Sequence, residues 1–230
     1  MKNTAILMIH GFMGSPKEFS KLIEFLEEKT KYDIFTFTLP GHSKEDDPKQ
    51  FKQELWLEAA EKELLKLIKL KYKHIYLLSH SMGGVLACDL ASKYQEVEKL
   101  VLLAPAFSFM GFSHKYLKYF KTTTKFSKIY SFFRRDPLVK RMLGVPKHLQ
   151  AEYLDLISSK QEVLKNVNAK VLQITGSKDK LVTKKDAKYV FNNIASKDKE
   201  LVNYKAAGHK ALSSADADAI HEKILEFFKS

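Results

Sequence analysis

Short apolar runs alternate along most of the chain with longer segments of helical periodicity, and this alternation limits the fold more than any other feature. Such a pattern is typical of a parallel sheet whose strands are joined by crossover helices. The predicted strands cover residues 5–9, 34–39, 74–79, 100–104, 171–175 and 200–204. The predicted helices cover residues 16–26, 48–70, 85–94 and 219–228. The sequence therefore predicts one α/β domain spanning residues 1–230, with a mostly parallel central sheet flanked by helices.

The first predicted helix carries a start signal. Ser15 and Glu18 have the spacing of a capping box, in which each side chain bonds the backbone N–H of the other residue, and Pro16 stands at the first helical position. We therefore expect this helix to begin directly after Ser15.

Residues 107–164 interrupt the alternation, because they contain several helical patterns but no convincing strand. They hold 7 of the 16 Phe residues, and residues 107–160 contain eight Lys and three Arg against three acidic residues. We predict a small helical cap here, inserted between core segments 1–106 and 165–230. Its positive charge fits either a solvated surface or weak association with an anionic membrane surface or an anionic substrate.

The single cysteine, Cys88, excludes an internal disulfide and fits a reducing compartment; we interpret it as a packed apolar side chain. The sequence shows neither an export signal nor an apolar run long enough to cross a bilayer. The expected location is therefore cytoplasmic. Although the net charge is +12, no nucleic-acid-binding motif accompanies it, so no nucleic-acid partner is predicted. Oligomeric state is not indicated.

One serine stands where a strand turns sharply into a helix. The predicted strand 74–79 leads into Ser79, His80, Ser81, Met82 and Gly83. In such a turn the middle residue is held in a strained conformation that exposes its hydroxyl, and the residues two positions away must be small. Gly83 meets this requirement, whereas Ser79 replaces the usual glycine. We predict Ser81 as a catalytic nucleophile.

A serine nucleophile needs a base, and the base needs a carboxylate that fixes its tautomer. His209 follows the last predicted strand and a glycine, which is the expected position of the base. Asp179 follows the strand before it, with Asp186 as the fallback carboxylate. The order Ser81, Asp179, His209 is the one that this kind of fold uses. His221 falls inside the last predicted helix, where we expect it at the surface.

Acyl transfer also needs N–H donors for the developing oxyanion. Met82 follows the nucleophile at a helix N-terminus, and Phe12 lies in the loop after the first strand. The backbone N–H groups of these two residues are the predicted donors and the predicted substrate-binding groups. His10 and His80 are interpreted as residues that shape the turns beside them.

The chain resembles the α/β-hydrolase superfamily, and within it the small bacterial carboxylesterases and monoacylglycerol lipases. The motifs that carry the resemblance are His10-Gly11-Phe12-Met13-Gly14, Pro40-Gly41-His42, His80-Ser81-Met82-Gly83-Gly84, Gly176-Ser177-Lys178-Asp179 and Gly208-His209. The resemblance implies hydrolysis of short- to medium-chain acyl esters through an acyl-enzyme on Ser81, with no cofactor and no metal.

Two other readings remain open on the sequence. A thioesterase or another acyl hydrolase would use the same three side chains, with the basic segment recognising an anionic carrier. A non-catalytic protein of this fold could instead dock on a membrane surface through the basic, aromatic insertion.

Overall fold

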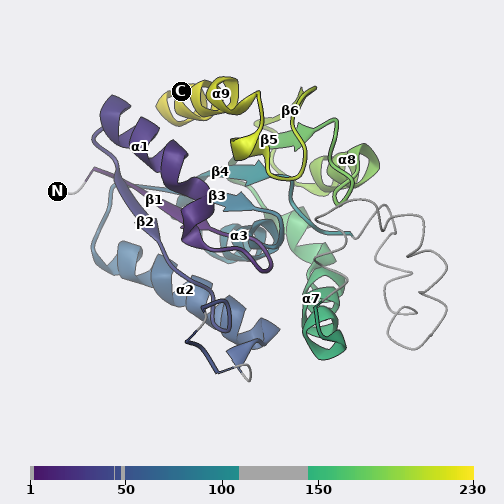
Figure 1. Cartoon of the computed structure of the whole chain (residues 1–230). Helices are drawn as coiled ribbons and strands as arrows, with labels where there is room; N and C mark the ends of the chain where they lie inside the picture. The colour runs from purple at the N-terminus through teal and green to yellow at the C-terminus, as the bar shows by residue number, and fades with distance from the viewer. Residues whose placement is uncertain (1–2, 44, 48–49, 109–144) are drawn as a thin grey trace.

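A computed structural model describes residues 3–43, 45–47, 50–108 and 145–230 (Figure 1). Its strands form one sheet in the order β2-β1-β3-β4-β5-β6, and every neighbouring pair is parallel. They are β1 (Thr4–Ile9), β2 (Asp33–Thr36), β3 (His74–His80), β4 (Val97–Leu103), β5 (Lys170–Gly176) and β6 (Lys199–Tyr204). The α/β prediction is confirmed, and β3, which leads to Ser81, lies inside the sheet.

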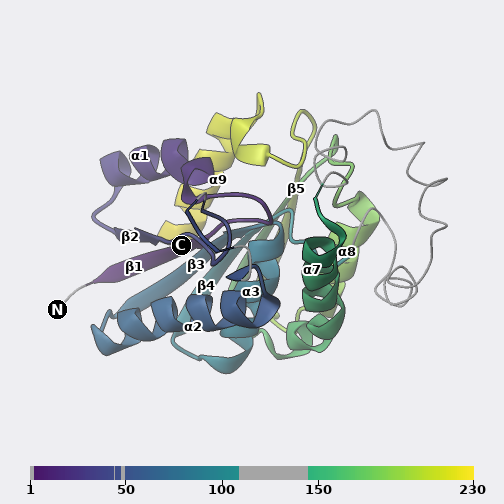
Figure 2. The same cartoon turned by 60° about the horizontal axis from the view of Figure 1, so that its bottom comes forward.

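Helices cover both faces of the sheet. α1 (Ser20–Lys29) and α9 (Ala217–Lys229) pack on one face, while α2 (Gln53–Lys69), α3 (Met82–Lys93), α7 (Lys147–Ser159) and α8 (Lys184–Asn193) lie on the other (Figures 1 and 2). Three short 3-10 helices complete the described elements: η1 (Pro16–Phe19), η3 (Gln161–Asn166) and η4 (Ala211–Ser213). Along β1, alternate residues enter the two apolar clusters, because side chains of a strand point to opposite faces. Both faces are therefore core, which explains the continuous apolar strand pattern.

The second strand is shorter than the sequence predicts. It was expected over residues 34–39, but pairing with β1 ends at Thr36. Beyond that point the backbone N–H of Leu39 donates to Nε2 of the buried His10 ring, at 3.0 Å. The chain leaves the sheet because a side chain, rather than the neighbouring strand, accepts this hydrogen bond.

The capping-box prediction at Ser15 is wrong. The Ser15 side chain makes no capping hydrogen bond. Helical backbone does begin directly after Ser15, with Pro16 as its first residue, but as the 3-10 turn η1, and α1 follows from Ser20. The Glu18 carboxylate turns instead toward the Gly11 backbone N–H and the His80 ring. Glu18, which the sequence pattern assigned to a helix cap, thus contacts the site described below.

His221 is also placed differently from the prediction. It was expected at the surface, but it is 4% exposed and its ring centroid lies 5.5 Å from that of Phe25 in α1. Burial lowers the pKa of the His221 imidazole, which keeps the ring neutral between the two helices. Cys88 is fully buried in α3, as predicted, and burial raises the pKa of its thiol.

The described part of the predicted insertion packs against the core. Residues 109–144, with six of the seven Phe residues of this segment, lie outside the described residues. In α7, Leu156 and Ile157 are buried in the cluster that includes α3. The Lys160 ammonium lies 2.8 Å from the carboxylate of Asp89, a buried residue of α3, and the Gln161 amide donates to the Phe107 carbonyl at 2.7 Å. The start and the end of the segment therefore meet at the core.

Within the described ranges, no helix is both long and apolar enough to cross a membrane.

Candidate active site

Ser81 lies at the turn between β3 and α3. Its backbone has φ 54° and ψ −118°, a conformation in the left-handed region that non-glycine residues rarely adopt. Three backbone hydrogen bonds hold it there: its N–H donates to the Leu103 carbonyl, and its carbonyl accepts from the N–H groups of Gly84 and Ala106. The strained turn that the sequence predicts is therefore formed, with Ser79 fully buried and its hydroxyl bonded to the Val101 carbonyl.

The start of α3 passes directly against the end of β1. A Cβ added to Gly83 would lie 2.3 Å from the Ile9 carbonyl oxygen and 2.7 Å from that of His10. Both atoms belong to the backbone, so neither can rotate away. Only glycine allows the helix to approach the strand at this point.

We expect Gly83→Ala to destabilise the fold by about 3 kcal/mol or more, because the added methyl group overpacks a site bounded by backbone. Thermal unfolding followed by circular dichroism measures this effect. The control is Gly208→Ala, since a Cβ there meets its nearest neighbour, the Lys178 carbonyl oxygen, at an ordinary 3.8 Å. Equal melting temperatures of the two variants would contradict the close approach.

His209 lies in the loop between β6 and η4 and reaches Ser81. Its Nε2 is 2.9 Å from Ser81 Oγ, and its Nδ1 is 2.8 Å from Asp179 Oδ2. Because the carboxylate only accepts, Nδ1 carries the proton and Nε2 offers its lone pair to the Ser81 hydroxyl. The loop is held at its base by the Asp216 carboxylate, which accepts from the N–H groups of Ala206 and Ala207.

Asp179 follows β5, and its side chain is fully buried. Its second oxygen, Oδ1, accepts the backbone N–H groups of Leu181 at 2.8 Å and Val182 at 2.9 Å. These bonds fix the carboxylate plane and leave Oδ2 for His209. Asp186, the fallback in the sequence, lies instead in the first turn of α8, where it caps the helix in a capping box with Thr183. The structure therefore brings Ser81, His209 and Asp179 together and leaves Asp186 in a structural position.

The loop after β1 lies against Ser81. A Cβ added to Gly11 would lie 3.0 Å from the Ser81 Cβ, and the Gly14 N–H donates to the Gly11 carbonyl to close a tight turn around Phe12 and Met13. Met82 is the first residue of α3, so its N–H has no acceptor inside the helix. The two predicted N–H donors thus lie in two segments next to Ser81: Phe12 in the loop after β1, and Met82 at the start of α3.

An aromatic cluster fixes this loop from outside. The Phe12 ring contacts the rings of Tyr153 (centroids 4.8 Å apart), Phe51 (5.5 Å), Trp56 (6.3 Å) and His42 (6.4 Å). Tyr153 comes from α7, so the described end of the predicted insertion packs directly beside the loop. Burial lowers the pKa of His42 to about 4, and this ring therefore acts as a neutral member of the cluster. Phe12 and the rings around it thus form an apolar wall, meaning a packed aromatic surface, next to the loop after β1.

Two residues that contact the site were not recognised as site residues in the sequence. His80, interpreted as a turn residue, donates from Nε2 to the His209 carbonyl at 2.9 Å. Its Nδ1 lies 3.2 Å from Glu18 Oε1. The sequence did place His80 directly before Ser81, which is a signal for a role at the site. Its partner Glu18 was not recognised because it matched the pattern of a helix cap. Among the described residues, no group of three or more His, Cys, Asp or Glu could hold a metal ion.

The comparison with family models agrees with this geometry. A model described as Serine aminopeptidase, S33 (Hydrolase_4) matches residues 2–216. The chain belongs to this family. It is a hydrolase, and its α/β-hydrolase fold confirms the resemblance seen in the sequence.

The proteins that this chain resembles are named for different activities. The chain is 24% identical over 226 residues to the thermostable monoacylglycerol lipase of Bacillus sp. strain H-257, covering 97% of this chain and 89% of that protein. It is 25% identical over 125 residues to the proline iminopeptidase of Elizabethkingia meningoseptica, covering 52% of this chain and 40% of that protein. Among solved structures, the monoacylglycerol lipase of Paleococcus ferrophilus matches with a TM-score of 0.73 at 20% identity, covering 96% and 92% of the two chains.

Proposed function

We propose that the chain is a serine carboxylic-ester hydrolase, of the carboxylesterase or monoacylglycerol lipase kind, that acts through an acyl-enzyme on Ser81. The observation that carries the proposal is the hydrogen-bonded line from Ser81 Oγ through the His209 ring to Asp179. The similarity to a bacterial monoacylglycerol lipase along nearly the whole chain supports the ester as substrate class.

In the proposed mechanism, Ser81 Oγ attacks the ester carbonyl carbon while His209 Nε2 takes the hydroxyl proton. The backbone N–H groups of Phe12 and Met82 stabilise the oxyanion, each contributing about 3 kcal/mol to the transition state. The tetrahedral intermediate collapses when His209 gives its proton to the leaving alcohol. Water then attacks the acyl-enzyme with His209 again as base, and Ser81 is released with the carboxylic acid.

Asp179 holds the Nδ1–H tautomer and stabilises the imidazolium that forms in both half-reactions. No step requires a metal or a cofactor. The apolar wall around Phe12 would favour acyl groups over charged substituents, since each buried CH₂ contributes about 0.8 kcal/mol.

The proposal extends to the surroundings of the site. Residues 107–164 are proposed as a cap, and weak contact of their basic part with anionic membrane surfaces is proposed as well. One of the eight lysines of that part, Lys160, already forms an ion pair with Asp89 inside the molecule. A cytoplasmic location is proposed because the one cysteine is a buried, free thiol.

The test is a comparison of kcat/KM on p-nitrophenyl esters from acetate to palmitate, on thioesters of matched acyl length, and on proline p-nitroanilide. We expect the oxygen esters to exceed the anilide by at least about 100-fold, with an optimum at short to medium chains. Faster thioester hydrolysis would move the assignment to a thioesterase. Activity on the anilide alone would replace it by the aminopeptidase activity that the family description names.

A further inference from the structure

Behind the three proposed catalytic side chains, Glu18 of η1 and His80 of β3 form a second, mostly buried pair. Glu18 Oε1 lies 3.2 Å from His80 Nδ1, and the two side chains are 22% and 10% exposed. The same Glu18 oxygen accepts the Gly11 backbone N–H at 3.1 Å. On the other side, His80 Nε2 lies 2.9 Å from the His209 backbone carbonyl. One pair thus joins the loop that carries Phe12 to the loop that carries His209.

The partners determine where the protons are. The His209 carbonyl can only accept, so His80 Nε2 must carry a proton. The lowered pKa of Glu18 keeps this carboxyl group ionised, and an ionised carboxylate only accepts, so His80 Nδ1, which lies 3.2 Å from Glu18 Oε1, carries a proton too. A histidine that donates from both nitrogens is an imidazolium, and the pair is therefore ionic. Burial lowers the pKa of His80, but the Glu18 charge and hydrogen bond outweigh it and raise this pKa above its ordinary value.

The remaining charged and titratable groups around the ring agree with this assignment. Burial raises the pKa of Glu18, but the charge and hydrogen bond of His80 overcome it and the pKa is lowered. The Asp179 carboxylate also favours a positive His80. Burial lowers the pKa of His10, which stays neutral, and the His209 ring lies 4.9 Å from the His80 ring.

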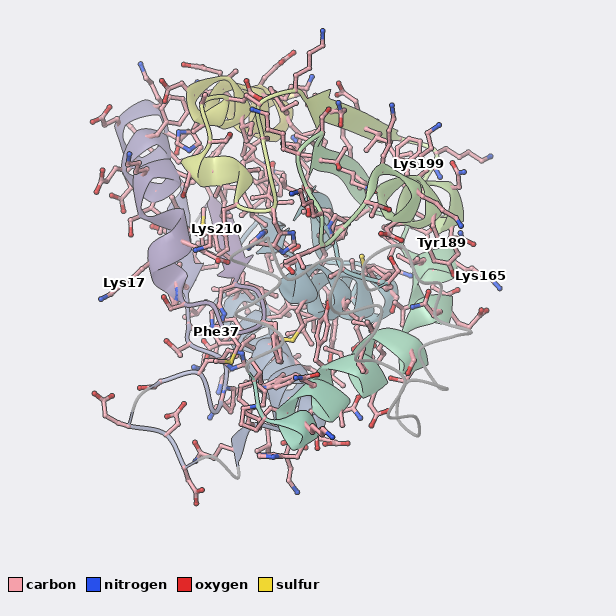
Figure 3. All side chains as sticks on the ribbon, turned by 45° about the vertical axis from the view of Figure 1, so that its right-hand side comes forward. Lys17, Phe37, Lys165, Tyr189, Lys199 and Lys210 are labelled. Atoms are coloured by element: carbon pink, nitrogen blue, oxygen red, sulfur yellow. The ribbon has the colours of Figure 1, made fainter. Side chains whose placement is uncertain are left out.

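We propose that Glu18 and His80 act as a positioning ion pair, which holds the backbone of His209 and the backbone of the Phe12 loop in the geometry that Ser81 requires. The inference rests on the proposed function of Ser81 and His209. Figure 3 labels Lys17 and Lys210, which are the chain neighbours of Glu18 in η1 and of His209 in the loop after β6.

The pair should make the activity fall at alkaline pH. Because the pKa of Glu18 is lowered and that of His80 is raised in the fold, the contribution of the pair is complete between the ordinary values of glutamate (about 4.3) and histidine (about 6.5). It is lost as the pH rises through the raised pKa of His80. A neutral His80 presents a lone pair to the Glu18 carboxylate, which repels it and releases the Gly11 loop. We expect kcat to fall at alkaline pH for this reason.

The test compares the pH profile of kcat on p-nitrophenyl butyrate for wild type, Glu18→Gln and His80→Gln. Both variants should lose between about 10- and 100-fold in kcat near neutral pH, with KM changed by no more than about twofold, because they misplace reacting groups rather than remove binding. The alkaline fall of the wild type should be absent from both. The matched control is Glu98→Gln, which breaks the exposed His74–Glu98 pair (2.8 Å) and should reproduce the wild-type profile. A wild-type profile in Glu18→Gln would overturn the proposal.

A second measurement does not depend on activity. Nitrogen NMR of the histidine rings, with His80 assigned from its absence in His80→Gln, reports whether both ring nitrogens are protonated at the ordinary histidine value of about pH 6.5. Two protonated nitrogens in wild type and one in Glu18→Gln are expected. A neutral His80 in wild type would refute the ion pair, even in an enzyme with full esterase activity. A wild type inactive on every ester would instead refute the proposed function, while the NMR result still decides the pair.

Discussion

Replacing Ser81 by alanine is expected to lower kcat on the best p-nitrophenyl ester by about 10⁵- to 10⁶-fold, because the change removes the proposed nucleophile, the hydroxyl that is bonded to His209 Nε2. The residual rate should come from the oxyanion donors and from binding alone. The loss should appear in kcat with little change in KM, since the hydroxyl contributes its bond in the transition state rather than to substrate binding. Initial rates at saturating ester, measured with a blank for spontaneous hydrolysis, give this number.

The matched control is Ser92→Ala in the same helix. The Ser92 hydroxyl donates only to the Asp89 carbonyl one turn earlier, so its loss should leave the rate within about twofold of wild type. Labelling with a fluorophosphonate should disappear in Ser81→Ala and persist in the control. A Ser81→Ala enzyme that keeps more than a hundredth of the wild-type kcat would assign the nucleophile to another residue.

Asp179→Asn is expected to lower kcat by about 10⁴-fold, the size known for this change in the Ser-His-Asp template, with little change in stability. The amide oxygen can take the place of Oδ1 and keep the bonds from the Leu181 and Val182 N–H groups. The amide nitrogen then occupies the place of Oδ2 and donates toward His209 Nδ1. The ring must adopt the other tautomer, in which Nε2 carries a proton and cannot accept the one from Ser81.

The control for this variant is Asp186→Asn, the other carboxylate that follows β5. It caps α8 through Thr183, so its replacement should lower the melting temperature by a few degrees and leave kcat within about threefold of wild type. Should Asp186→Asn prove the more damaging change in kcat, the assignment of the carboxylate would have to be exchanged.

The order of the strands could be predicted from the sequence because both faces of the sheet are buried, which produces short apolar runs that few other structures explain. The end of β2 could not be predicted, because the Leu39 N–H donates to the ring of His10, a residue 29 positions earlier in the chain. The position of His221 was missed for a related reason. A lone histidine in an amphipathic helix does not reveal that α1 packs over it.

At the site, Ser81, Asp179 and His209 could be proposed because each lies in the turn or loop after a predicted strand, which is a local signal. Glu18 and His80 could not be paired, because their contact joins residues 62 positions apart and Glu18 also fitted a local capping pattern. Local patterns therefore point to the proposed reacting groups, whereas the groups proposed to hold them in place depend on tertiary contacts.

The hydrogen bond between the Gln161 amide and the Phe107 carbonyl has a consequence for how this enzyme can diverge. It fastens together the two points at which the chain departs from the sheet and comes back to it. Since the entropic cost of closing a loop grows only slowly with its length, residues can be gained or lost between Phe107 and the start of α7 at little cost, whereas α7 itself packs into the core. On the proposed function, a change of length confined to that stretch would alter the substrate preference while leaving Ser81, Asp179 and His209 in place.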